Sequence, residues 1–242
     1  MIHFHVITPA YNCKDDIETT LWSVVGQTYK NWSMTVIDDV SNDGTGEFVK
    51  NFVKSIGFGK KIKVIRRNEK FGEVQNTLEV CSRLDHDVVV VRLDAGDWLT
   101  DLGCFEILRR VYEQNNPAVL WTAHRWAWTN QNISGPIDPQ VSVYEQDWRS
   151  SHLKTFRVRE IKGLNNKNFR DEDGNFIMIA CDQAIFLPMM ERARREGRSL
   201  VFLPMVMYHY SIDLQKPDLF TNDRSLRQKY SAEWIRARGY IE

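Results

Sequence analysis

Four consecutive valines at positions 88–91 restrict the fold of this chain more than any other stretch. An exposed strand would alternate apolar with polar residues, and a buried helix would need a longer apolar run. The valines therefore predict a strand that is buried on both faces and lies in the middle of a sheet. The segment continues to Asp94 and Asp97, which flank Ala95 and Gly96.

Two explanations of this carboxylate pair are open. In the simpler one, Asp94 ends the strand and Asp97 caps the helix that follows. In the other, both side chains point into the crevice at the carboxyl end of the sheet, where open α/β sheets bind their ligands. The second explanation needs support from other parts of the chain.

Composition indicates a globular protein without a strong overall charge. Of the 242 residues, 43% are hydrophobic, which is enough for one large domain. Because 32 basic residues balance 32 acidic ones, we expect no attraction to nucleic acid, and any bound anion must be held by local groups. No stretch approaches the roughly 20 apolar residues of a membrane span, so we expect a cytoplasmic protein without an integral membrane segment. The four cysteines lack CxxC spacing, which suits reduced core thiols.

Strands and helices alternate in the first half of the chain, which predicts a largely parallel, right-handed sheet. After Trp121 the pattern weakens, and the chain to about residue 177 is expected to form an irregular covering layer. Pro188 is placed at the first position of a helix, where a missing N–H is tolerated. Besides the valine strand, we expect strands at Phe4–Thr8, Ser33–Ile37, Lys61–Arg66, Ala118–Trp121, Leu200–Leu203 and Val206–Tyr210, and helices that begin near Asn12, Thr45, Phe71, Asp101, Met189 and Asp223.

Three of the predicted strands end in the polar sequences TPAYN, IDDVSNDGT and RLDAGD. In a parallel sheet these ends meet at one edge, which brings together Tyr11, Asp38, Asp39, Asp94 and Asp97. An aromatic ring can stack on a pyrimidine, and a carboxylate can accept a hydrogen bond from the ring N–H of the base. A divalent cation is also needed, because carboxylates alone would repel phosphate. The edge therefore favours binding of a nucleoside diphosphate together with a metal ion. The sequence contains neither the GxGxxG motif of dinucleotide-binding folds nor a P-loop.

These motifs, in this order, resemble the family 2 glycosyltransferases of the GT-A fold, including small viral and bacterial members. The resemblance rests on P-x-Y-N, Q-T-Y, D-D-x-S-x-D-G-T and D-x-x-D, covers residues 4–121 and resumes near Asp182. It implies a single α/β GT-A domain over residues 1–242, Rossmann-like, with helices flanking a central, mostly parallel sheet. Residues 1–121 would form the nucleotide-sugar-binding half, and residues 122–242 the acceptor-binding half.

The resemblance, together with the chemistry of the side chains, assigns roles to individual residues. Asp182 is expected to be the catalytic base, and Trp126 and Trp128 to stack on a sugar of a glycan acceptor. A divalent cation, Mn²⁺ or Mg²⁺, is expected at Asp94, Asp97 and His209. The residues expected to bind the nucleotide-sugar donor are Thr8, Pro9, Tyr11, Asp38, Asp39, Gly72, Asn76, Asp94 and Ala95.

Simpler explanations stay open for several of these residues. Tyr11 can pack on the sheet as a loop aromatic, Gly72 can merely open a helix, and His209 can be a half-buried strand histidine. The pair Trp126 and Trp128 can belong to the core.

Two departures from the family pattern bear on the chemistry. Gly96 stands where the family has the second acid of its D-x-D motif, so a metal must rely on Asp94 or Asp97. Cys181 stands where a glutamate usually precedes the base. The expected activity is inverting transfer of a sugar from a nucleoside diphosphate sugar, with UDP as the expected nucleotide, to a hydroxyl of a glycan or similar acceptor. The alternative is a non-catalytic nucleotide- or glycan-binding module derived from such an enzyme.

Overall fold

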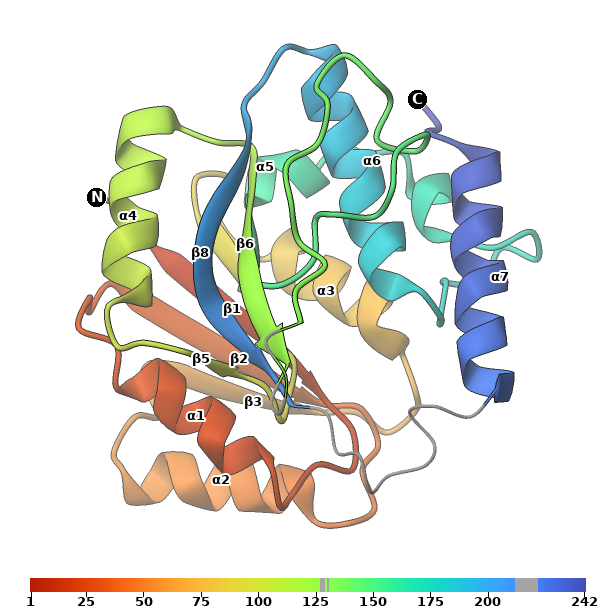
Figure 1. Ribbon diagram of the computed structural model, residues 1–242. Coiled ribbons are helices and arrows are strands. Elements are labelled where there is room, and N and C mark those ends of the chain that lie inside the picture. The colour runs from red at the N-terminus through yellow and green to blue at the C-terminus, as the bar shows by residue number, and fades with distance from the viewer. Residues whose placement is uncertain (127–128, 130, 212–221) are drawn as a thin grey trace.

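An eight-stranded sheet forms the centre of the computed structural model, which describes residues 1–126, 129, 131–211 and 222–242. The strand order is β3-β2-β1-β4-β7-β6-β8-β5, and helices cover both faces of the sheet (Figure 1). The strands are β1 (Phe4–Ala10), β2 (Trp32–Asp38), β3 (Ile62–Arg66), β4 (Val89–Arg92), β5 (Trp98–Leu99), β6 (Val119–Trp126), β7 (Lys154–Arg157) and β8 (Leu200–Tyr210). The helices are α1 (Ile17–Val25), α2 (Thr45–Ser55), α3 (Gly72–Ser82), α4 (Cys104–Asn115), α5 (Val158–Ile161), the 3-10 helix η1 (Asn166–Phe169), α6 (Cys181–Arg195) and α7 (Asn222–Arg238).

The valine strand is confirmed as a central strand buried on both faces. β4 lies between β1 and β7, and Val89, Val90 and Val91 have no solvent exposure. β1 pairs in parallel with both β2 and β4, and β2 pairs in parallel with β3. The carboxyl ends of β1, β2 and β4 therefore meet at one edge of the sheet, as predicted.

Two hydrophobic cores fill the space between the sheet and its helices. One joins α1, α2 and α4 to the sheet through residues such as Leu21, Phe52 and Phe105. The other joins α3, α5 and α6 to the sheet and includes Ile235 of α7. Within the described ranges, no helix combines the length and the apolar character needed to cross a bilayer.

The irregular layer expected after Trp121 contains a strand that the sequence did not reveal. β7 is inserted between β4 and β6 and runs antiparallel to both. The sequence did not indicate this strand because it contains Lys154 and Arg157, and lysine and arginine are rarely buried without a partner. Both side chains are nevertheless buried. Both have partners, because Lys154 pairs with Asp182 and Arg157 donates to the backbone carbonyl of Asp87.

The prediction that Pro188 begins a helix is wrong. Pro188 lies inside α6, which starts seven residues earlier at Cys181. Ala184 and Leu187 are buried against the sheet, so tertiary packing stabilises the first turns of the helix. This packing offsets the backbone hydrogen bond that proline removes.

The two strands expected at 200–203 and 206–210 form a single strand, β8. Its register against β6 shifts between Thr122 and His124, which leaves Pro204 in the irregular part of the ladder. Proline is tolerated there because it does not need to donate a ladder hydrogen bond. The chain can therefore continue from one predicted strand into the next.

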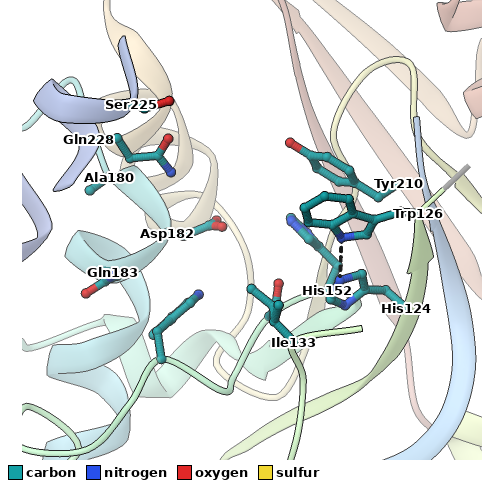
Figure 2. Close-up of a pocket in the computed structure, with 12 residues that line it drawn as sticks. His124, Trp126, Ile133, His152, Ala180, Asp182, Gln183, Tyr210, Ser225 and Gln228 are labelled. Atoms are coloured by element: carbon teal, nitrogen blue, oxygen red, sulfur yellow. Dashed lines mark hydrogen bonds between the residues drawn. The ribbon is translucent and has the colours of Figure 1, made fainter. Parts of the chain in front are cut away.

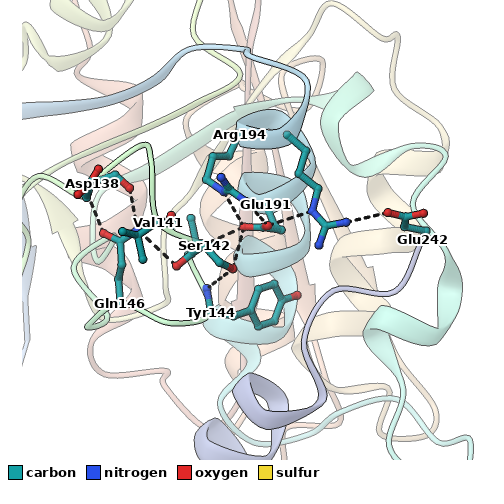
Figure 3. A network of polar contacts seen from close by, with 10 residues as sticks. Asp138, Val141, Ser142, Tyr144, Gln146, Glu191, Arg194 and Glu242 are labelled. Carbon is teal, nitrogen blue, oxygen red and sulfur yellow. Dashed lines mark hydrogen bonds and ion pairs between the residues drawn. The ribbon is translucent and has the colours of Figure 1, made fainter.

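A buried carboxylate ties α6 to the segment that precedes β7 (Figure 3). Glu191 accepts hydrogen bonds from the hydroxyl of Ser142, the backbone N–H of Val143 and the guanidinium groups of Arg194 and Arg195. Burial opposes ionisation of Glu191, but these donors outweigh it and lower its pKa to about 2. Glu191 is therefore ionised at neutral pH and fixes this segment against the helix.

We expect Glu191→Gln to lower the free energy of unfolding by about 2 to 3 kcal/mol at pH 7, because a neutral amide cannot accept from all four donors. Urea titration measures this change. The folded pKa of Glu191 lies below the unfolded value of about 4.3, so its contribution is present above that pH and is lost as the pH falls toward 2. Glu196→Gln, an exposed change at the end of α6, is the control and should shift stability by less than about 0.5 kcal/mol. Equal stability of Glu191→Gln and wild type would contradict this role.

Candidate active site

The loops that follow β1 and β2 are tied to each other at the edge of the sheet. Asn12 accepts a hydrogen bond from the backbone N–H of Asn42, and its own N–H donates to Ser41. Asp43 accepts from the N–H of Lys14 and also from the first N–H of α2, so it caps that helix. These contacts hold the start of the first loop beside the end of β2.

A cavity of about 350 Å³ opens where β1, β2 and β4 end, and we call it the Tyr11 cavity. The ring of Tyr11 is half exposed, and the ammonium group of Lys70 lies 3.4 Å from the ring centre. A nucleobase that stacks on this side of the ring would take the place of Lys70. Six of the nine residues predicted to bind the donor line the cavity: Pro9, Tyr11, Asp39, Gly72, Asp94 and Ala95.

The other three predicted donor residues do not line the Tyr11 cavity. Thr8 is fully buried in β1. Asp38 accepts from the backbone N–H of Ser41, and Asn76 accepts from the guanidinium group of Arg67. In this arrangement they support the loops that form the cavity.

Asp39 also organises the beginning of α3. Its two carboxylate oxygens accept hydrogen bonds from the N–H groups of Phe71 and Gly72, each at 2.9 Å. Gly72 has a φ of 73°, and a Cβ at this position would lie 2.4 Å from the sulfur of Met178. Glycine is therefore favoured here by the positive φ, whereas the half-exposed side chain of Met178 could move to admit a Cβ.

The structure does not bring the three predicted metal ligands together. Asp94 faces the Tyr11 cavity, but the carboxylate of Asp97 accepts from the hydroxyl of Tyr208 at 2.5 Å and from the backbone N–H of Ser211 at 2.7 Å. His209 stacks on a tryptophan ring of β5 with 4.4 Å between ring centres. Across the ranges that the structure describes, no three His, Cys, Asp or Glu side chains are arranged to hold a metal ion.

Two buried cations lie in adjacent strands next to the cavity. Arg92 of β4 and Lys154 of β7 are partners in the sheet register and are 2% and 1% exposed. Each pairs with a carboxylate in the first turn of a covering helix: Arg92 with Glu73 of α3, and Lys154 with Asp182 of α6. Arg92 also lies 3.3 Å from Asp94, so the positive and negative groups form one connected set.

Asp182 borders two further cavities. The central cavity, of about 390 Å³, also contains Asp94, and the Trp126 cavity, of about 330 Å³, contains Trp126. Burial opposes ionisation of Asp182, but Lys154, His152 and Arg92 together outweigh it and lower the pKa of Asp182 to about 2. The carboxylate is thus ionised at neutral pH and accessible from both cavities. The three acids at 171–173, which lie near Asp182 in the sequence, are exposed.

The two walls of the Trp126 cavity face each other in Figure 2. β6 and β8 supply His124, Trp126 and Tyr210, and α6 supplies Asp182 on the opposite side. The indole N–H of Trp126 donates to Nε2 of His124 at 3.1 Å, and burial lowers the pKa of His124 to about 4, so this histidine is uncharged at neutral pH. Trp128, which was predicted beside Trp126, lies outside the described residues.

The three cavities adjoin one another. The Tyr11 and central cavities share Glu73 and Asp94, and the central and Trp126 cavities share His152 and Asp182. Sequence reasoning did not identify Glu73, His152 or Lys154 as parts of this site. The charged residues at 154 and 157 gave no sign of a buried strand, so the placement of Lys154 next to Arg92 could not be foreseen.

Comparison with known proteins decides the family. The model of "Glycosyl transferase family 2" matches residues 5–182, well over half of the chain. The chain belongs to glycosyltransferase family 2. This family 2 chain is 39% identical over 67 residues to TuaG of Bacillus subtilis (strain 168), which is named for teichuronic acid biosynthesis. The match covers 28% of the chain and 25% of TuaG.

Solved structures confirm the GT-A fold. The mannosyltransferase PcManGT from Pyrobaculum calidifontis, solved with GDP-Man and Mn²⁺, is similar with a TM-score of 0.67 and 14% identity over 99% of this chain and 65% of that one. S. aureus TarS 1-349, solved with UDP, is similar with a TM-score of 0.64 and 17% identity over 100% of this chain and 67% of that one. The family 2 chain thus spans a quarter of TuaG and about two thirds of these solved chains.

Proposed function

We propose that this family 2 glycosyltransferase moves a sugar from a nucleoside diphosphate sugar to a hydroxyl of a glycan or similar acceptor, with inversion at the anomeric carbon. The observation that carries the proposal is the position of the Asp182 carboxylate, which borders both the central cavity with Asp94 and the Trp126 cavity, and its lowered pKa agrees with this role. A donor that reaches from the Tyr11 cavity into the central cavity would place its anomeric carbon between the two carboxylates. An acceptor in the Trp126 cavity would then approach from the side of Asp182.

A single displacement in this geometry needs one base. Asp182 accepts the proton of the acceptor hydroxyl, and the acceptor oxygen forms its bond to the anomeric carbon. The bond from that carbon to the diphosphate breaks, and the diphosphate leaves with the electron pair. Because attack and departure occur on opposite faces, the product is inverted. Trp126, oriented by His124, offers a ring against which a sugar face can stack.

Of the three predicted metal ligands, only Asp94 lies where it could bind a divalent cation. Asp94 lines the Tyr11 and central cavities and could bind Mn²⁺ or Mg²⁺ together with diphosphate oxygens, whereas Asp97 and His209 are engaged elsewhere. Such an ion would neutralise the charge on the leaving diphosphate. The mannosyltransferase PcManGT was solved with Mn²⁺, which supports a divalent ion for this chain.

UDP is the nucleotide that we propose for the donor. TarS was solved with UDP, and the Tyr11 cavity offers an aromatic ring and the carboxylate of Asp39 for a pyrimidine. The division into a donor half at 1–121 and an acceptor half at 122–242 stays a prediction, as does the cytoplasmic location. The Tyr11 cavity also takes wall residues from the second half, namely Met178 and Cys181.

Calorimetry with UDP in the presence and absence of Mn²⁺ tests the proposed donor site. With one carboxylate ligand, we expect the metal alone to bind weakly and UDP affinity to rise about tenfold when Mn²⁺ is present, with the same factor for Mn²⁺ when UDP is present. An equal UDP affinity in Mn²⁺ and in EDTA would mean that the diphosphate is bound without a metal. Binding of UDP without turnover of any donor would favour the alternative of a non-catalytic binding module.

A further inference from the structure

Lys154 is a buried lysine whose ammonium group has a single polar partner among the described residues. Its ammonium nitrogen lies 2.5 Å from Oδ2 of Asp182, and no hydrogen bond to another acceptor is found among the described residues. The rings of Phe186 and Trp148 lie nearby, with centres 5.2 and 5.8 Å from the nitrogen. An apolar residue would fill this position at a lower desolvation cost, so packing alone does not account for a lysine.

The contact leaves one oxygen of Asp182 available. Lys154 engages Oδ2, while Oδ1 has no hydrogen-bond partner within the described part of the chain. The lysine approaches from β7, which is held on both sides by β4 and β6, so its position is well defined. Figure 2 shows the Asp182 carboxylate pointing into the cavity toward the wall that carries Trp126 and Tyr210.

We infer that Lys154 is a positioning residue that holds one carboxylate oxygen of Asp182 so that the other faces the acceptor hydroxyl. The inference rests on the proposed function, because it requires that Asp182 accepts the acceptor proton. In that step the O–H bond of the acceptor breaks and its proton binds Oδ1. Lys154 keeps its own protons and its contact with Oδ2 throughout.

Lys154 also sets the charge state of Asp182 at the start of the step. Burial raises the pKa of a carboxyl group, and Lys154 is the strongest of the groups that oppose this effect at Asp182. Without the lysine, burial and the neighbouring carboxylates would raise the pKa of Asp182. The other titratable or charged groups around Asp182 are His152 from the segment before β7, Arg92 and Asp94 at the end of β4, Glu73 of α3, Cys181 of α6, and Asp223 and Arg227 of α7.

A double-mutant cycle separates positioning from a purely structural role. Turnover and UDP affinity are measured for Lys154→Met, Asp182→Asn and the double variant. We expect Lys154→Met to lower turnover about tenfold in the wild-type background, to lower it no further beside Asp182→Asn, and to leave UDP affinity unchanged. Lys162→Met is the matched control, because the Lys162 ammonium bonds to the carbonyl of Leu84 and lines none of the three cavities. It should retain wild-type turnover.

The pH profile supplies a second, independent readout. Wild-type turnover should show no loss from Asp182 protonation between pH 8 and pH 5, whereas Lys154→Met should lose turnover at a higher pH than wild type, because the pKa of Asp182 is raised. Lys154→Gln replaces Lys154→Met in both experiments if the apolar side chain prevents folding. The inference would be overturned if Lys154→Met lowered turnover equally in the wild-type and Asp182→Asn backgrounds, or if its pH profile matched that of wild type. Asp182→Asn tests the proposed base separately. If Asp182→Asn were as active as an active wild-type enzyme, the assignment of Asp182 as the base would be overturned.

Discussion

Asp182→Asn should lower the turnover of sugar transfer by roughly 10² to 10⁴ and leave UDP affinity within about twofold. The amide keeps the shape of the side chain but cannot accept the acceptor proton as a base. The substitution removes the charge that pairs with Lys154, so circular dichroism and thermal unfolding must show that the variant is folded. Steady-state transfer kinetics and UDP calorimetry on the same preparation measure the two quantities separately.

Glu172→Gln provides the matched control for Asp182→Asn. Glu172 is an acid in the exposed turn between η1 and α6, and it accepts a hydrogen bond from the indole of Trp234, away from the cavities that Asp182 borders. We expect this variant to retain wild-type transfer. Near wild-type turnover in Asp182→Asn, with loss of turnover in Glu172→Gln, would show that the base has been assigned to the wrong acid.

Asp39→Ala should weaken UDP binding by about ten- to a hundredfold, because a charge-assisted hydrogen bond to the base contributes roughly 1.5 to 3 kcal/mol. The same substitution removes the acceptors for the N–H groups of Phe71 and Gly72, so we also expect a loss of stability of about 1 to 2 kcal/mol. A simple loss of affinity would therefore not separate the two roles of Asp39.

Asp43→Ala separates the contribution of Asp39 to binding from its contribution to the fold. Asp43 also accepts backbone N–H groups, from Lys14 and Thr45, but it does not line the Tyr11 cavity. We expect a similar loss of stability in Asp43→Ala with UDP affinity near that of wild type. Equal affinities in the folded Asp39 and Asp43 variants would remove Asp39 from the donor site.

The residues at the strand ends could be predicted because their placement depends on local sequence. The alternation of strands and helices up to Trp121 fixes a parallel sheet, and a parallel sheet gathers the ends of β1, β2 and β4 at one edge. Tyr11, Asp39 and Asp94 follow directly from that geometry, and all three line one cavity.

The second half of the site could not be predicted, because its pattern depends on partners that are distant in the sequence. The lysine at position 154 is typical of an exposed loop, because a lysine is rarely buried without a partner. Its partner, Asp182, lies 28 residues further along the chain. The hydrogen bond from Tyr208 to Asp97, likewise, depends on the antiparallel pairing of β8 with β5. Long-range ion pairs and hydrogen bonds of this kind leave no periodic signal in the sequence.

The most direct test of a sugar-transferring enzyme is the release of nucleotide from a panel of nucleotide sugars, incubated with Mn²⁺ and a panel of glycoside acceptors. We expect at least one UDP-sugar to be consumed, with UDP released and a glycoside of inverted anomeric configuration formed, as nuclear magnetic resonance of the product would show. Absence of both UDP release and product for every donor, in a folded protein that binds UDP, would contradict transfer as the function of this site.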